Sequence, residues 1–167
     1  MLILGIDPGS VVTGYGVVQS GTGGLRALTH GTITPPPELS FLDRLPYIAA
    51  AIEELVRRVA PDGAAIEDAF HARNSRVALK LGCVRGVAIL PIMRARVPIY
   101  EYAPRLVKKA VTGSGAAEKE QVRRMVRLLL GLGAVPLDLD ASDALAVAIC
   151  HAHALPFHRA RVNAARA

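Results

Sequence analysis

The sequence predicts an α/β domain built on a mixed five-stranded sheet that is flanked by helices. Two observations lead to this prediction. Five short runs of aliphatic and β-branched residues are bounded by glycine, proline or polar turn residues, as strands are. After the third run, such strands alternate with segments in which apolar residues recur at helical spacing. Three strands followed by alternating helices and strands is the order of a mixed sheet with helices packed on it.

The strands are recognised by their flanks as much as by their composition. The first is a continuous apolar run that stops at the turn signal Asp7-Pro8-Gly9-Ser10. The links between the first three runs are short, which indicates an antiparallel meander. The five strands are expected at residues 2–6, 15–19, 25–33, 64–67 and 97–100.

Five helices are expected after the meander. Pro46 falls inside the apolar pattern of the first, where it must occupy the first turn or kink the helix. The second follows Asn74 or Ser75, either of which could cap it, and its inward face is expected to carry Val77, Leu81, Val84 and Ala88. The first helix is expected at residues 42–59, the third opens at Pro104, and the last two span residues 118–130 and 140–152.

Length, charge and cysteine content restrict the class of protein. The chain has 167 residues, of which 1–156 are expected to form one domain and 157–167 a basic, disordered tail without apolar periodicity. A formal charge of +6 favours a polyanionic partner such as nucleic acid. Cys83 and Cys150 fit no metal-binding pattern and are expected to be buried, reduced thiols of a cytoplasmic protein. No window approaches ~18 uninterrupted apolar residues, so no membrane span is expected.

Four carboxylates are candidates for a metal site. Asp7 and Glu67 each follow a buried strand, where a lone carboxylate is costly unless it is paired or metal-bound. Asp140 and Asp143 are spaced i, i+3 and share one helical face. Four converging carboxylates would repel one another, and an all-oxygen site suits Mg²⁺ or Mn²⁺. Taken singly, Asp140 could be a helix N-cap and Asp7 a turn residue, whereas Glu67 has no such role to fill.

The same residues lie in motifs that follow one another from roughly residue 2 to residue 153. The segments are Leu4-Gly5-Ile6-Asp7-Pro8-Gly9-Ser10 with Thr13-Gly14-Tyr15-Gly16-Val17, Ala65-Ile66-Glu67-Asp68-Ala69-Phe70, Asn74 and Ala78-Leu79-Lys80-Leu81-Gly82 with Arg85-Gly86-Val87-Ala88-Ile89, Glu101-Tyr102-Ala103, Val107-Lys108 with Ala117-Glu118-Lys119, and Asp140-Ala141-Ser142-Asp143-Ala144-Leu145-Ala146. In this order, and with all four acidic motifs present, they resemble the RuvC family of bacterial Holliday junction resolvases.

The resemblance implies an RNase H-like fold, a homodimer and two-metal hydrolysis of phosphodiesters in opposing strands of four-way junction DNA, in recombination and repair. It implies that the four carboxylates bind two Mg²⁺ ions and that a branch-migration helicase is a partner. Lys108 and Lys119 match family lysines that face DNA, and Phe70 matches an aromatic residue that stacks on junction bases. Two departures are His71, where an apolar or aromatic residue is expected, and Asp138, a fifth acid that competes with Asp140 for the third ligand position.

A basic stripe accompanies these motifs. Lys119, Arg123 and Arg127 recur every four residues on one helix, and Arg73 and Arg76 flank the Phe70 segment. Like charges at this spacing destabilise a helix slightly, which an anionic partner offsets. We expect phosphate contacts that position DNA without reading its sequence, and the alternative is a solvated helix face.

Two other functions compete with junction cleavage. The opening Asp7-x-Gly9…Gly14 also resembles the phosphate-binding hairpin of actin-like and sugar-kinase proteins, but those need a second, similar domain. Another RNase H-like nuclease would act on RNA–DNA hybrids or RNA. Gly82 and Gly86, four apart on one helix, suit the close approach of a second helix, and hence a dimer that cuts two symmetric strands.

Overall fold

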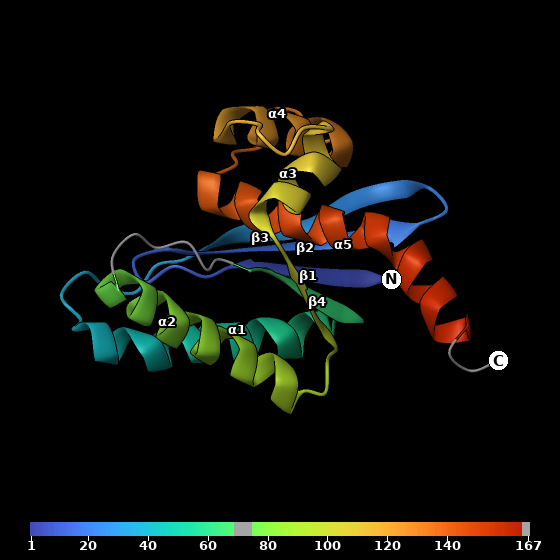
Figure 1. The fold of residues 1–167 in the computed structure, drawn as a ribbon. Coiled ribbons are helices and arrows are strands. Elements are labelled where there is room, and N and C mark those ends of the chain that lie inside the picture. The colour runs from blue at the N-terminus through green and yellow to red at the C-terminus, as the bar shows by residue number, and fades with distance from the viewer. Residues whose placement is uncertain (69–74, 165–167) are drawn as a thin grey trace.

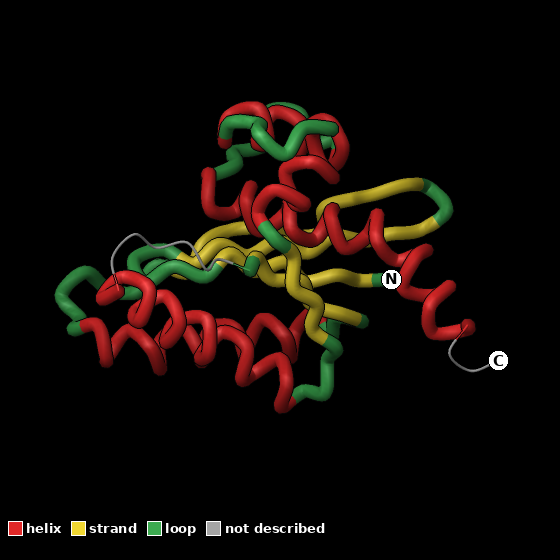
Figure 2. Tube along the Cα trace, viewed as in Figure 1, coloured by secondary structure: helices red, strands yellow, loops and turns green. Residues whose placement is uncertain are grey.

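The computed structural model describes residues 1–68 and 75–164 of the chain, with side chains as far as residue 155. A five-stranded sheet forms the middle layer, with two helices on one face and three on the other (Figures 1 and 2). The elements are β1 (Leu2–Asp7), β2 (Thr13–Gly21), β3 (Gly24–Ile33), α1 (Phe41–Val59), β4 (Gly63–Glu67), α2 (Ser75–Arg94), β5 (Ile99–Tyr102), α3 (Pro104–Thr112), α4 (Lys119–Leu130) and α5 (Leu139–Ala164).

The sheet has the strand order β3-β2-β1-β4-β5, so β1 is central. The first three strands form the expected antiparallel meander, and β1 pairs in parallel with β4, which pairs in parallel with β5. The predicted mixed five-stranded α/β sheet is therefore confirmed. Because β1 and β4 are parallel neighbours, their carboxyl ends lie at the same edge of the sheet.

One face of the sheet is covered by α1 and α2. Ile48 and Ile52 of α1 and Val84 and Ala88 of α2 are buried with Leu4, Ile6 and Val17 of the sheet in one apolar core. α1 begins after Ser40, whose hydroxyl accepts a hydrogen bond from the amide of Asp43. Pro46 lies inside α1, past its first turn, and its side chain is exposed.

The other face is covered by α5, which packs between the sheet and the α3–α4 pair (Figure 1). This helix is buried on several sides, so it has no single apolar stripe, and small residues let it lie close to the sheet. Three glycines of β1 and β2 leave no room for a side chain. A Cβ would collide with the carbonyl oxygen of Ala144 at Gly5, with that of Asp140 at Gly14, and with the side chain of Leu145 at Gly16.

Several expectations from the sequence require correction. Val77 is exposed, because α2 begins at Ser75 and its first turns extend beyond the core. Cys83 is exposed on α2, whereas Cys150 is buried as expected. α5 continues past residue 152 to Ala164 and so runs into the segment from 157 for which a disordered tail was expected. The division into a domain of residues 1–156 and a tail of residues 157–167 stays a prediction, because residues 165–167 and the side chains after 155 lie outside the described structure. No helix among the described residues is long and apolar enough to cross a membrane.

Candidate active site

Asp7 and Glu67 end the two parallel strands at the centre of the sheet. Ile6 pairs with Ile66 across β1 and β4, so the residues that follow them, Asp7 and Glu67, emerge side by side at one edge. Both side chains are partly buried. This is the arrangement that was expected from two acids at the ends of buried strands.

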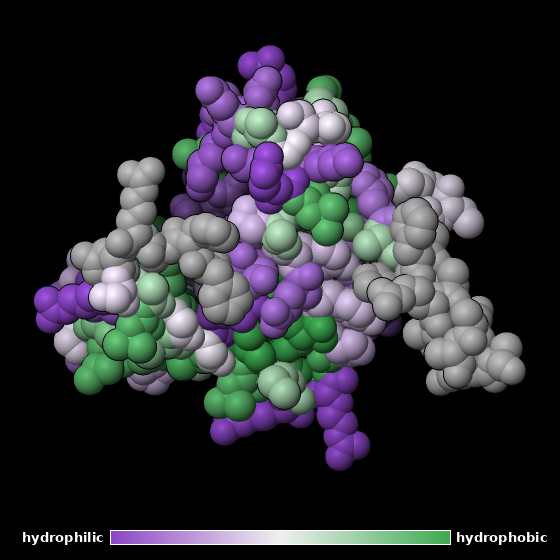
Figure 3. All heavy atoms as spheres, viewed as in Figure 1, coloured by the Kyte–Doolittle hydropathy of each residue, from purple (hydrophilic) through white to green (hydrophobic). Residues whose placement is uncertain are grey.

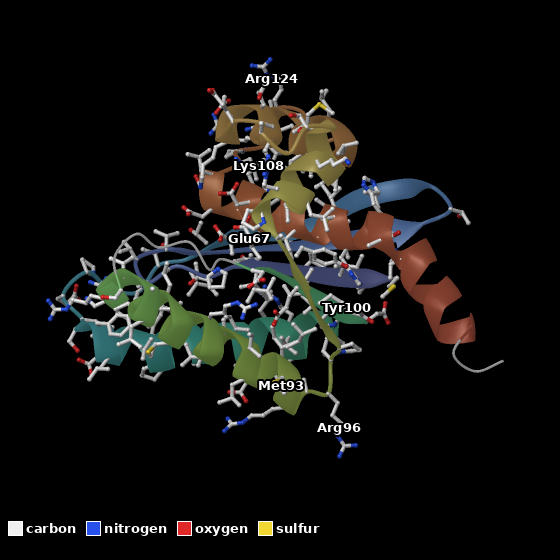
Figure 4. All side chains as sticks on the ribbon, viewed as in Figure 1. Glu67, Met93, Arg96, Tyr100, Lys108 and Arg124 are labelled. Carbon is white, nitrogen blue, oxygen red and sulfur yellow. The ribbon has the colours of Figure 1, made fainter. Side chains whose placement is uncertain are left out.

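Asp140 and Asp143 reach the same edge from the first turns of α5. Gly14 allows this approach, because the backbone carbonyl of Asp140 occupies the space that a side chain at position 14 would need. Asp143 then points to the strand ends, and together with Asp7 and Glu67 it lines a hollow of about 100 Å³. Its other lining residues are Val107, Lys108, Lys119, Val122 and Ala146. Figure 4 shows Glu67 beneath α3, which carries Lys108.

The carboxylates act strongly on one another. The pKa of Asp7 is raised from 3.8 to about 7, chiefly by burial, then by the negative charges of Asp143 and Glu67 and, less, of Asp140. The pKa of Glu67 is also raised, by burial first and then by Asp143. Lys119 opposes both shifts, and Lys108 opposes the second. The four expected acids therefore form one electrostatic cluster.

Asp140, rather than Asp138, belongs to this cluster. Asp140 is partly buried and contributes to the raised pKa of Asp7, whereas Asp138 is exposed and does not contribute. Asp138 acts through its backbone: its carbonyl oxygen accepts a hydrogen bond from the amide of Ser142 and so belongs to the start of α5. This favours Asp140 as the third acidic position.

A lysine closes the hollow. The ammonium of Lys119, at the first residue of α4, lies 2.6 Å from Oδ2 of Asp143. The side chain of Asp143 is 20% exposed and that of Lys119 is 64% exposed, so the lysine reaches in from the surface. Its pKa is raised, mainly by the hydrogen bond to Asp143.

The donor set fits a hard divalent cation. All the acidic groups offer oxygen ligands, and burial first and then mutual repulsion raise the pKa of Asp7 and of Glu67, so a nearby cation would favour their ionised forms. As the described side chains stand, no three acidic, histidine or cysteine groups are close enough together to hold an ion. Gathering the carboxylates around a metal therefore requires side-chain rotation.

The residues of the expected basic stripe form contacts with other residues of this chain. Arg123 contacts Glu120 at 2.9 Å, and Arg127 donates hydrogen bonds of 2.8 Å to the carbonyls of Gly133 and Val135. Arg127 therefore supports the loop between α4 and α5, and the sequence spacing did not reveal this. Of the other expected DNA contacts, Arg76 lies exposed in the first turn of α2, whereas Phe70 and Arg73, like His71, fall in residues 69–74, outside the described residues.

Reasoning from the sequence did not identify two supports of the site. One is Gly14, although a glycine inside a strand is a signal of close backbone approach. The other is Arg44 of α1, whose guanidinium donates hydrogen bonds to the carbonyls of Ser10, Pro37 and Leu39. It ties the loop that follows Asp7 to the segment before α1. An arginine in an amphipathic helix carries no sequence signal for this role.

Comparison with known proteins agrees with this geometry. Residues 3–151 match the family model described as crossover junction endodeoxyribonuclease RuvC. Proteins of that name from Chloroflexus aggregans and Maricaulis maris are 46% and 50% identical, and the matches cover 93% and 90% of this chain and 95% and 90% of theirs. A solved structure of Thermus thermophilus RuvC in complex with a Holliday junction substrate superposes with a TM-score of 0.87 at 36% identity, covering 95% of this chain and 96% of that one.

Proposed function

Because the chain belongs to the RuvC family of crossover junction endodeoxyribonucleases, we propose that it resolves Holliday junctions by hydrolysing phosphodiesters in opposing strands. The observation that carries the proposal is the carboxylate cluster of Asp7, Glu67, Asp140 and Asp143 at the strand ends. An acidic cluster of this kind serves hydrolysis only with a cation between it and the phosphate, because both are negatively charged.

We propose Mg²⁺ as the cation, with two ions in each site and Mn²⁺ as a substitute. Asp7, Glu67 and Asp143 would hold them, with Asp140 at the edge of the cluster. When bound, such ions supply an activated water and neutralise charge on the phosphate. The raised pKa of Asp7 supports this assignment, since a nearby divalent charge would return that carboxyl to its ionised form.

The lysines of α3 and α4 supply positive charge on the substrate side. Lys108 and Lys119 line the hollow, and Figure 3 shows hydrophilic side chains gathered over these two helices. We propose that they bind the backbone of the strand to be cut, and that Arg73, Arg76 and Arg123 add phosphate contacts, with Phe70 stacking on junction bases. Each of these contacts orients DNA without reading its sequence.

A dimer follows from the symmetric cut and is supported by α2. Gly82 and Gly86 line a groove with Ala78, Leu81 and Ile89, and a Cβ on either glycine would meet no atom within 4 Å. The other lining residues of this groove are Pro8, Glu67, Asp68 and Arg85. Beside the groove, Leu79, Leu90 and Met93 are 71%, 46% and 62% exposed. We propose that the same helix of a second copy packs here, which removes this apolar surface from water.

The family resemblance also suggests a branch-migration helicase as partner and the cytoplasm as the place of action. Both remain proposals that rest on the family alone. The helicase partner would be tested by its effect on the rate of junction cutting.

A substrate panel tests the function. A four-way junction, a linear duplex and an RNA–DNA hybrid are incubated with the protein and Mg²⁺, and we expect symmetric nicks in the junction alone. The variant Asp7→Asn should lose cutting yet keep binding the junction in Ca²⁺ or EDTA. Preferential cutting of the hybrid would instead favour a different RNase H-like nuclease.

A further inference from the structure

The contact between Lys119 and Asp143 joins a surface residue to the centre of the acidic cluster. The ammonium stands 2.6 Å from Oδ2 of Asp143, although the two residues lie on different helices, 24 positions apart. The same ammonium also favours the ionised forms of the neighbouring acids, because its positive charge lowers the pKa of both Asp7 and Glu67. It therefore acts on both strand-end acids, whereas Lys108 acts on Glu67.

Helix stability does not explain a lysine at this position. Lys119 is the first residue of α4, where the helix dipole disfavours a positive charge. The start of the helix is stabilised elsewhere, because the side-chain oxygen of Gln121 accepts a hydrogen bond from the amide of Glu118, 3.0 Å away. The backbone beneath Lys119 is thus held independently, and its four-carbon side chain is free to swing without disturbing α4.

A divalent ion and this ammonium compete for the same carboxylate. Asp143 lines the hollow with Asp7 and Glu67, so any ion held by the three must draw on its carboxylate. The ammonium already lies against Oδ2 of that carboxylate, and in this arrangement no three described acids stand close enough together to bind an ion. A divalent ion at the carboxylate would also repel the ammonium beside it. Metal binding and the Lys119–Asp143 contact therefore oppose each other, and this coupling must be reciprocal.

We propose that Lys119 is a resident counter-ion of the metal-free site, which compensates the carboxylates until a metal ion displaces it from Asp143. In the metal-free protein the ammonium reduces the repulsion among the acids. On metal binding it is released on the side of the hollow that faces solvent, where it can bind a phosphate of the substrate. This second step rests on the proposed function, whereas the displacement itself does not.

The test measures metal affinity in the absence of DNA. Mn²⁺ is titrated into metal-free protein at low ionic strength, and the free ion is followed by its electron paramagnetic resonance signal. Lys119→Met removes the charge but keeps the length of the side chain. Lys109→Met is the matched control, because Lys109 is an exposed lysine of α3 that does not line the hollow.

We expect Lys119→Met to bind Mn²⁺ roughly 5- to 20-fold more tightly than the wild type, within the usual range of coupling between two sites. Its melting temperature in EDTA should fall below that of the wild type, since the acids lose their counter-ion. Lys119→Arg, which keeps the charge, should stay within about threefold of the wild-type affinity.

Equal or weaker Mn²⁺ binding by Lys119→Met would overturn the proposal, and so would an equal gain in Lys109→Met, which would show a general charge effect. If the wild type binds no Mn²⁺ at all, the metal assignment fails and takes this proposal with it. Because the titration contains no DNA, a wrong choice of nucleic-acid substrate would leave its result unchanged.

Discussion

The replacement Asp7→Asn should stabilise the metal-free protein at alkaline pH while it abolishes cutting. Burial and the charges of Asp143 and Glu67 raise the pKa of Asp7 from 3.8 to about 7. The folded protein therefore holds this proton more tightly than the unfolded chain does. Its contribution to stability is complete below pH 3.8 and is lost as the pH rises toward 7, above which the folded protein carries an unfavourable buried charge.

The rise in the pKa of Asp7 sets the size of the change in folding free energy. Raising this pKa from 3.8 to about 7 corresponds to about 4 kcal/mol, and at least half of this free energy is lost between about pH 5 and pH 8. Asparagine resembles the protonated acid and carries no charge to be destabilised. The variant should thus gain up to about 4 kcal/mol over the wild type at pH 8, and less at pH 5. Relaxation of neighbouring side chains reduces the gain, so this is an upper value.

Urea denaturation in EDTA at pH 5 and pH 8 measures the difference. With a slope of about 2 kcal/mol per molar urea, the midpoints of variant and wild type should separate by up to about 2 M at pH 8. Asp138→Asn removes an exposed carboxylate outside the hollow and serves as the control for loss of a charge. Adding Mg²⁺ should then stabilise the wild type more than Asp7→Asn. A variant–wild-type difference that is the same at both pH values would refute the reasoning.

Three further changes test other parts of the structure. Gly14→Ala forces a side chain against the carbonyl of Asp140, so we expect a loss of about 1–3 kcal/mol in stability and about 100-fold in cutting rate, measured by denaturation and a junction assay. His151→Phe removes the buried 2.7 Å contact between the ring of His151 and the hydroxyl of Tyr102, and should cost about 1–3 kcal/mol in denaturation without changing metal affinity. Leu90→Glu places a charge on the exposed apolar side of α2, and light scattering should show monomers where the wild type forms dimers.

The two acids on the sheet were predictable because each directly follows, in the sequence, the apolar run that forms its strand. An acid directly after a buried run marks the sheet edge, and Asp7 and Glu67 needed only the parallel pairing of β1 and β4 to become neighbours. The helical part was harder. α5 is buried against the sheet, α3 and α4, so its sequence lacks the one-sided apolar pattern by which its end could be located.

The basic residues show why the contacts of a side chain cannot be predicted from its spacing along the sequence. The spacing of Arg123 and Arg127 correctly places them on one helix, but their partners are Glu120 and the carbonyls of a loop. Backbone carbonyls have no sequence signature, so the role of Arg127 in supporting the loop before α5 could emerge only from the fold. Periodicity reports which residues share a face, and not what that face contacts.

Stability and chemistry oppose each other in the acidic cluster. Close packing of α5 on Gly5 and Gly14 brings the carboxylates together, and the same packing buries Asp7 and raises its pKa. The fold tolerates the resulting repulsion because an apolar core lies on each side of the sheet and because Lys119 and Lys108 supply two positive charges. Two positive charges do not balance four acids, so an uncompensated negative potential persists at the strand ends. That residual potential is what should bind a divalent cation, and a variant that relieves it should gain stability and lose metal affinity together.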